Sequence, residues 1–118
     1  MTEGAETTPI LDIVYKLYTI EVELFGARVE ALEIDDHILD KIESGHGVPF
    51  HDMEEACYSE RRHVRRGRAG LYKVFSQTDA GRFLLVVLAD KGDGVWKVVT
   101  ARQMTETERR LYRRQMGE

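Results

Sequence analysis

The segment RFLLVVLAD, residues 82–90, constrains the fold more than any other, because seven apolar residues stand together between an arginine and an aspartate. A continuous apolar run of this length is typical of a buried strand. Turn signals bound the run on both sides, TDAG at 78–81 and KGDG at 91–94. The run therefore predicts the central strand of a β-sheet.

The segments on both sides of this run predict a meander. GLYKVFSQ, residues 70–77, alternates apolar and polar side chains, as a strand does. VWKVVTAR, residues 95–102, follows the second turn and supplies the next strand. RRHVRR, residues 61–66, is typical of a polar strand at the edge of a sheet.

Helical patterns precede and follow these strands. DDHILDKIES, residues 35–44, starts with a capping aspartate and carries an apolar stripe, and FHDMEEAC at 50–57 has apolar residues at i, i+3 and i+7. Thr105 and Glu108 have the T-x-x-E spacing of a capping box at the start of a last helix. These patterns predict an α+β domain: a small antiparallel meander, two short helices before it, and a C-terminal helix packed on it.

The N-terminal part predicts an extension of this domain. Residues 1–8 are small, polar and acidic, and we expect a disordered tail. A helix is predicted over about 9–17, and alternating segments on both sides of FGAR predict a hairpin, with one longer helix as the alternative. We therefore expect a single domain over 9–118, with a helix and hairpin extension over about 9–28.

Charge is distributed unevenly along the chain. Residues 1–58 carry 14 acidic and 3 basic side chains, whereas residues 59–118 carry 7 acidic and 14 basic ones. This asymmetry favours a polyanion or an acidic protein as partner of the C-terminal half. The alternative is that the two halves fold together and neutralise each other.

Targeting signals and cysteine content indicate the compartment. No segment approaches the ~20 apolar residues that span a membrane, so we expect no membrane partner. The N-terminus lacks the pattern of a signal peptide. Cys57 is the single cysteine and cannot form an internal disulfide, which favours a reducing cytoplasm.

An arginine cluster is the candidate nucleic-acid-binding site. In a strand, Arg62 and Arg66 would share one face and Arg61 and Arg65 the other. A planar guanidinium group binds phosphate through two parallel hydrogen bonds. The alternative is an edge strand whose charge prevents association with another sheet. The cluster comprises Arg61, Arg62, Arg65, Arg66 and Arg68.

Arg82 and Arg102 are candidate catalytic residues. Arg82 opens one apolar strand and Arg102 closes the next, so an antiparallel hairpin places them near the same end of the sheet. Two guanidinium groups there could clamp one phosphate and neutralise charge as a transition state forms. The alternative is that both form salt bridges with nearby carboxylates.

Three further residues are candidates for proton transfer. His46 stands between two glycines in GHG, and histidine is a side chain that suits general acid–base catalysis, unless His46 is a loop histidine without a role. Glu108 and Tyr112 are fallback groups, and helix capping and packing explain them equally well.

Metal and cofactor motifs are weak or missing in the sequence. His46, His51 and Asp52 could ligate a metal, but H-x4-H in a turn is a weak signal, and we expect no metal. No phosphate-cradling glycine motif and no dinucleotide fingerprint occurs, so we expect no cofactor.

Three motifs taken in order resemble the BrnT toxins of type II toxin–antitoxin systems. They are GHGVPFHDMEEA, GRFLLVVLAD and VVTARQMTETERRLY. The His-Gly-Val turn of that family corresponds to residues 46–48, the Ser-Ala-Arg-like strand end to 100–102, and the T-x-x-E-R-x-x-Y helix to 105–112. The resemblance covers about residues 30–115 and leaves the acidic N-terminal segment as an extension.

This resemblance implies a RelE-like fold and a metal-independent endoribonuclease that is neutralised by a cognate antitoxin. RNA would then be the substrate, with Arg82 and Arg102 on the phosphate, His46 as acid or base, and the arginine cluster along the backbone. The alternative function is a non-catalytic BrnT-like module whose basic face binds nucleic acid or an acidic protein. We also expect the apolar stripe of the 9–17 helix to pack on the sheet or on a second copy of the chain, as in a homodimer.

Overall fold

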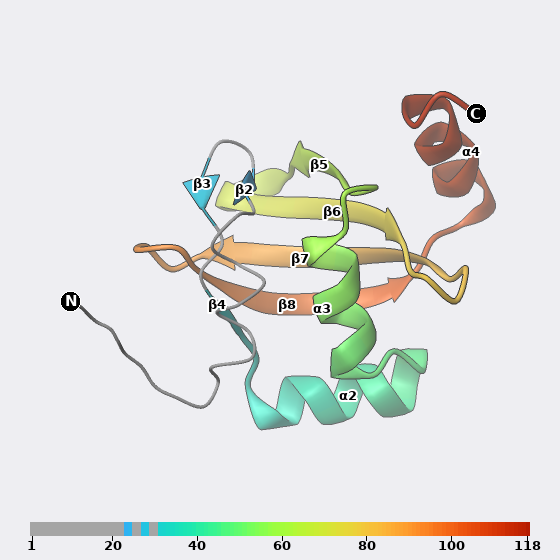
Figure 1. Cartoon of the computed structure of the whole chain (residues 1–118). Coiled ribbons are helices and arrows are strands. Elements are labelled where there is room, and N and C mark those ends of the chain that lie inside the picture. Colours follow the sequence, from blue (N-terminus) through green and yellow to red (C-terminus); the bar gives the residue numbers. More distant parts are fainter. Residues whose placement is uncertain (1–22, 25–26, 29–30) are drawn as a thin grey trace.

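The computed structural model describes residues 23–24, 27–28 and 31–118. In Figure 1 the strands of the main sheet run side by side, α3 crosses in front of them, and α4 lies at the end of the sheet where β8 stops. The predicted tail 1–8 and the helix predicted over 9–17 lie outside the described residues. The elements are β2 (Glu23–Leu24), β3 (Ala27–Arg28), β4 (Ala31–Glu33), α2 (Asp36–His46), α3 (Phe50–Tyr58), β5 (His63–Arg66), β6 (Leu71–Gln77), β7 (Phe83–Asp90), β8 (Val95–Gln103) and α4 (Glu106–Gln115).

The main sheet has five strands in the order β4-β8-β7-β6-β5. The apolar run therefore forms the central strand β7, and β5 to β8 form the predicted antiparallel meander with β5 at the edge. The α+β class, with a mostly antiparallel sheet and a C-terminal helix packed against it, is confirmed.

The predicted N-terminal hairpin is only partly correct. Within the described residues, β2 and β3 pair antiparallel across a two-residue connection. The second alternating segment was expected to be an arm of that hairpin, but β4 instead joins the main sheet and pairs parallel with β8. Burial of Leu32, which is 6% exposed in the core, is the physical reason for this placement.

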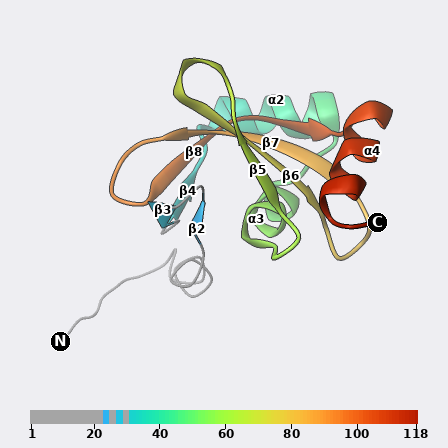
Figure 2. The same ribbon diagram turned by 90° about the horizontal axis from the view of Figure 1, so that it is seen from above.

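The sheet has two faces with different cover. Leu84, Val86 and Leu88 of β7 point to one face and pack with Trp96 under α2 and α3; we call this the α2–α3 face. Leu85, from the same strand, points to the other face and belongs to a second cluster under α4; we call this the α4 face. Seen from above, α4 lies at one end of the sheet (Figure 2). The second cluster consists of Phe75, Leu85, Met104 and Tyr112.

The helix α2 differs from its prediction at both ends. Asp35 precedes the helix, but its side chain does not cap it; the carboxylate instead lies 2.9 Å from Nζ of Lys97. At the other end the helix continues to His46. Gly47 then adopts the left-handed conformation (φ 66°) and donates its N–H to the carbonyl of Glu43 at 3.1 Å. His46 is therefore the last residue of a helix and not part of a turn between two glycines.

The capping box of α4 is confirmed. The N–H of Glu108 donates to Oγ1 of Thr105 at 3.2 Å, and the N–H of Thr105 donates to the Glu108 carboxylate at 2.9 Å. Met104, which is 6% exposed, fills the connection between β8 and α4 and anchors the helix on the sheet. In the part of the chain that is described, no helix has the length and apolar character needed to span a membrane.

Candidate nucleic-acid interface

A single carboxylate fixes the position of Arg102 on the α4 face. Arg102 pairs with Leu85 across β8 and β7, so both side chains point to that face. Its Nη1 and Nη2 donate to Oε1 and Oε2 of Glu108 at 2.8 and 2.9 Å, and Nη1 also donates to the carbonyl of Gln103 at 3.0 Å. Hydrogen bonding to Arg102 lowers the pKa of Glu108, and the same pair raises the pKa of Arg102. Both groups are therefore charged at neutral pH, and Glu108 is a weak base.

One edge of the Arg102 guanidinium group stays open. Its Nε–H makes no hydrogen bond to any described residue, and the side chain is 37% exposed. A guanidinium group can bind two anions along two different edges, each through a pair of N–H donors. Glu108 occupies one edge, and the edge formed by Nε and Nη2 is available to a phosphate.

Arg82 lies on the opposite face of the sheet. It precedes β7 by one residue, and its Nη1 donates to Oδ2 of Asp52 at 2.7 Å while Nη2 donates to the carbonyl of Gly47 at 2.9 Å. Leu84 pairs with Gln103, so Arg82 and Arg102 share one end of the sheet. Because their guanidinium groups lie on different faces with different partners, the predicted clamp on one phosphate is not formed.

His46 and Tyr112 are also separated from each other. His46 is exposed and adjoins Gly47, whose carbonyl accepts from Arg82, so it lies at the Arg82 side of the sheet end. Tyr112 is 2% exposed, and its hydroxyl donates to the carbonyl of Arg61 at 2.6 Å. Burial raises the pKa of Tyr112. The single hydroxyl proton of Tyr112 is used in this hydrogen bond, which connects α4 to the turn before β5.

The arginine cluster does not form one continuous track. The strand β5 begins at His63, so Arg61 and Arg62 lie in the preceding turn. The guanidinium group of Arg61 forms an ion pair with the Glu118 carboxylate, and Nη1 of Arg62 donates to the carbonyl of Ser59 at 2.8 Å. Both side chains thus stabilise the turn.

The other three arginines of the cluster point in different directions. Arg66 pairs with Tyr72, and its guanidinium carbon lies 5.6 Å from the centre of the Tyr72 ring on the α2–α3 face. Arg68 is exposed in a short 3-10 turn after the strand. Arg65 pairs with Lys73, and this pair points to the α4 face.

Sequence reasoning missed His63 and Lys73. His63 pairs with Phe75 of the second cluster, which places it on the α4 face beside Arg65 and Lys73. Burial, and then the charge of Arg65, lower the pKa of His63. Period-two alternation in both strands, combined with the hairpin pairing of 61–66 with 70–77, was the signal that could have found this group.

Arginines of α4 extend the basic surface next to Arg102. The guanidinium carbons of Arg109 and Arg113 lie 5.5 and 4.9 Å from the centre of the Phe83 ring. Tyr112 contacts the same ring edge-on, with centroids 6.0 Å apart. The face thus combines aromatic and cationic groups at the sheet end that carries Arg102.

A pocket of about 910 Å³ lies elsewhere, between α3, the turn before β5 and the β6–β7 connection. Its lining includes Glu54, whose Oε2 is buried without a hydrogen-bond partner among the described residues. Burial raises the pKa of Glu54 to about 7, and the charge of His51 opposes this only in part. The pocket is therefore rich in carboxyl groups and unsuited to a phosphate.

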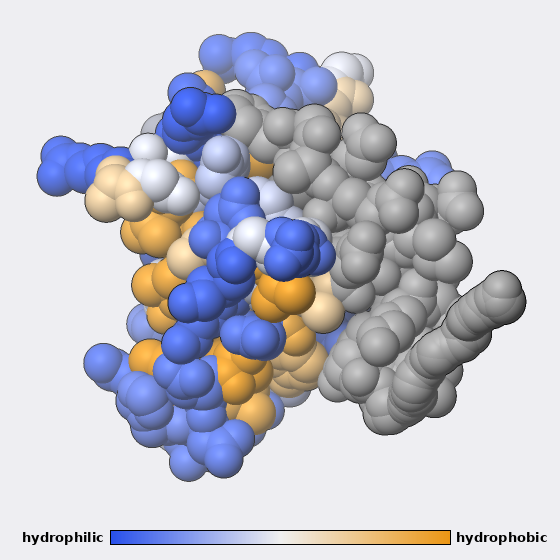
Figure 3. All heavy atoms as spheres, turned by 90° about the vertical axis from the view of Figure 1, so that its left-hand side faces the viewer, coloured by the Kyte–Doolittle hydropathy of each residue, from blue (hydrophilic) through white to orange (hydrophobic). Residues whose placement is uncertain are grey.

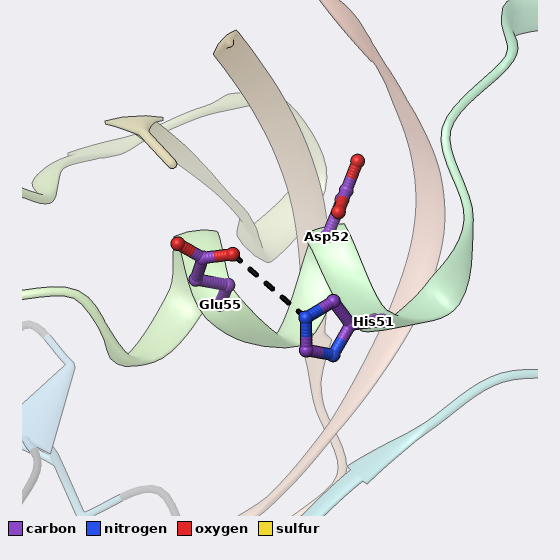
Figure 4. Close-up of side chains that lie close together, drawn as sticks. All are labelled: His51, Asp52 and Glu55. Carbon is purple, nitrogen blue, oxygen red and sulfur yellow. Dashed lines mark ion pairs between the residues drawn. The ribbon is translucent and has the colours of Figure 1, made fainter. Parts of the chain in front are cut away.

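Three residues of α3 could hold a metal ion. Ligand atoms of His51, Asp52 and Glu55 lie within 4.8 Å of one another. Figure 4 shows that His51 faces Glu55, and Nε2 of His51 lies 4.0 Å from Oε1 of Glu55. Asp52 is already bound to Arg82, and Glu55 accepts the N–H of Asp79. A cation here would compete with the Arg82 guanidinium group for Asp52.

No known protein family and no curated protein significantly matches this sequence. Among solved structures, the ribonuclease toxin BrnT of Brucella abortus is similar, with a TM-score of 0.56 and 15% sequence identity. The similarity covers 64% of this chain and 97% of that chain. It confirms the BrnT-like fold that the sequence motifs imply, and at this identity it shows the fold alone.

Proposed function

We propose that this protein binds RNA on the α4 face of its sheet and cleaves it without a metal ion. The observation that carries the proposal is the Arg102–Glu108 pair, in which a carboxylate holds a guanidinium group and leaves one edge open. The BrnT-like fold supports RNA as the substrate, since the similar structure is that of a ribonuclease toxin.

In RNA cleavage the 2′-hydroxyl loses its proton to a base and its oxygen bonds to the adjacent phosphorus, while the bond to the 5′-oxygen breaks and an acid protonates that leaving oxygen. Arg102 would act on the phosphate under attack. Its Nε–H and outer Nη2–H donate to the two non-bridging oxygens, and they stabilise the negative charge that builds there during attack. Glu108 is then a positioning residue: it keeps the guanidinium group in place before RNA arrives, which reduces the entropy cost of binding. This role replaces proton transfer by Glu108, which its lowered pKa disfavours.

His46 remains the proposed acid or base. It is exposed at the same end of the sheet as Arg102 but on the side of Arg82. An RNA bound to Arg102 must therefore pass around the start of β7 and the end of β8 to contact His46. Arg82 then holds the start of α3 through Asp52 and is not placed on the phosphate.

Cleavage of a labelled mixed RNA by purified variants tests this proposal. Arg102→Ala should lose on the order of 100-fold in rate, Arg102→Lys should also be impaired because ammonium cannot bind bidentately, and EDTA should have no effect. Arg110→Ala, which removes an equal charge from the exposed side of α4, is the matched control, with circular dichroism to check folding. Equal rates for Arg102→Ala and the control would refute the assignment of Arg102.

The alternative function is binding without cleavage. One observation favours it: apart from Glu108, no titratable side chain of the described residues is bound to Arg102. Figure 3 shows hydrophobic atoms at the surface between hydrophilic ones on the side that carries the β7–β8 turn. Wild-type protein that binds RNA at low salt and leaves it intact would establish this alternative.

Three finer proposals accompany this function. We propose a cognate antitoxin as protein partner, a cytoplasmic location, and a single domain over 9–118 in which the N-terminal extension serves self-association or packing. Co-expression with the product of any short reading frame found next to the gene, followed by co-purification, tests the first. Light scattering of the full chain and of a chain lacking residues 1–18 tests the last.

A further inference from the structure

A group of basic side chains lies on the α4 face at the far side of the sheet from Arg102. Arg65 and Lys73 are exposed and stand directly opposite each other on β5 and β6. His63, two residues before Arg65 in the same strand, points to the same face. A Cβ atom added to Gly67 would lie 3.7 Å from Cγ and Cε of Lys73, so the lysine stem runs beside β5.

The positive charge of this group is not balanced within the described part of the chain. Among residues 31–118, no carboxylate forms an ion pair with Arg65 or Lys73. Like charges directly opposite on antiparallel strands repel each other. The charge of Arg65 also acts on His63, whose pKa it lowers in addition to the effect of burial. By contrast, carboxylates pair with Arg61, Arg82, Lys97 and Arg102.

We infer that His63, Arg65 and Lys73 form an anion site that takes a phosphate group. An anion between Arg65 and Lys73 replaces their repulsion by two attractions, since a guanidinium fork and an ammonium group both donate to phosphate oxygens. His63 adds a third donor when it carries a proton, which a bound phosphate favours. The site explains why three basic groups stand together on one face of the sheet with no carboxylate of the described residues paired to Arg65 or Lys73.

The identification of this anion as an RNA phosphate rests on the proposed function. Lys73 pairs with Val87, and Val87 pairs with Thr100, which lies two residues before Arg102. Lys73 and Arg102 are thus two strand spacings apart across the sheet and two residues apart along a strand. The resulting distance is ~12 Å. The two sites therefore hold different phosphates, and one RNA strand would cross β6 and β7 between them.

Inorganic phosphate is the first probe of this site, at constant ionic strength against chloride. Phosphate should raise the melting temperature of the wild type and the pKa of His63, followed by NMR of the imidazole. Lys73→Gln should lose both effects, whereas Lys41→Gln, the same change on the exposed surface of α2, should keep them. In chloride, Lys73→Gln should melt no lower than Lys41→Gln, because the substitution removes a repulsion.

Labelled single-stranded RNA is the second probe. Lys73→Gln should weaken binding about two- to fivefold relative to Lys41→Gln, as for an exposed ion pair. The slope of log affinity against log salt should decrease by about 0.7, as for one phosphate contact on a single strand. Equal affinity and equal slope for the two variants would overturn the RNA assignment of the site.

The two probes separate the anion site from the proposed function. If phosphate leaves the melting temperature and the pKa of His63 unchanged, the anion site is refuted, even if Arg102→Ala abolishes RNA cleavage. If phosphate has both effects and Lys73→Gln removes them, the anion site stands, even if the protein neither binds nor cleaves RNA.

Discussion

Replacing Glu54 with glutamine should stabilise the protein at pH 8 and have little effect near pH 4.5. Glu54 lines the pocket beside α3, and no described residue donates a hydrogen bond to its buried Oε2. Burial raises the pKa of Glu54 from 4.5 to about 7. The folded protein therefore holds this proton more tightly than the unfolded chain does. As pH rises from 4.5 to 7, the wild type loses stability, and above pH 7 the loss is complete.

The size of this effect follows from the pKa difference and from solvent screening. A change in pKa from 4.5 to about 7 corresponds to at most ~3.5 kcal/mol, at ~1.4 kcal/mol for each pH unit. The Glu54 carboxyl is only half-buried in an open pocket, so screening by water reduces this to ~1 kcal/mol. Glutamine has almost the same shape and no charge to desolvate, and it should regain that amount at pH 8.

Urea denaturation at pH 5 and pH 8 measures this effect. Trp96 is the single tryptophan and is 1% exposed, so its fluorescence reports unfolding of the core. Glu43→Gln, on the exposed surface of α2, is the control for loss of one carboxylate. The reasoning fails if the stability difference between Glu54→Gln and the wild type is the same at both pH values, since linkage requires it to grow with pH.

Three other substitutions test contacts that hold the elements together. Thr105→Ala should cost about 1 kcal/mol through loss of the N-cap of α4, and an unchanged melting temperature would show that the cap contributes nothing. Tyr112→Phe should cost about 1 kcal/mol because the carbonyl of Arg61 loses its donor, yet RNA cleavage should persist; loss of cleavage in a folded Tyr112→Phe protein would restore Tyr112 as a proton carrier. Asp52→Asn should lower the melting temperature by weakening the bond to Arg82, measured against His51→Asn as control.

Local patterns in the sequence were sufficient for much of the fold. The apolar run of β7 identified the central strand, and the turn signals beside it identified the meander, because each depends only on neighbouring residues. The capping box of α4 is likewise local. The parallel pairing of β4 with β8 joins residues about 60 positions apart along the chain, and no local pattern encodes it.

Which side chains share the candidate site depends on the register in which β7 and β8 pair, and the sequence alone did not determine this register. A register shift between Val87 and Leu88 changes which residues of β8 point to the α4 face beyond that position. Arg102 therefore points away from Arg82, although both stand at the same sheet end. Their partners, Glu108 and Asp52, come from two different helices, and pairing between elements of this kind requires the tertiary structure.

Gly45 lies inside α2, and this explains why the sequence predicted a helix that ends before His46. Glycine inside a helix costs roughly 0.5–1 kcal/mol relative to alanine, which favoured a helix that ends before it. The left-handed conformation of Gly47 and its bond to Glu43 give the helix a regular end two residues later.

The two ends of α4 are fastened to opposite margins of the meander. At its start, Glu108 binds Arg102 of the last strand; at its end, Tyr112 and Glu118 both bind Arg61, which precedes the first strand. The helix thus connects β8 with the segment before β5, two parts of the meander that are not neighbours in the sheet. In native-state hydrogen exchange we therefore expect the amides of β5 and α4 to open together as one cooperative unit, with similar protection, although some 40 residues separate them in the chain.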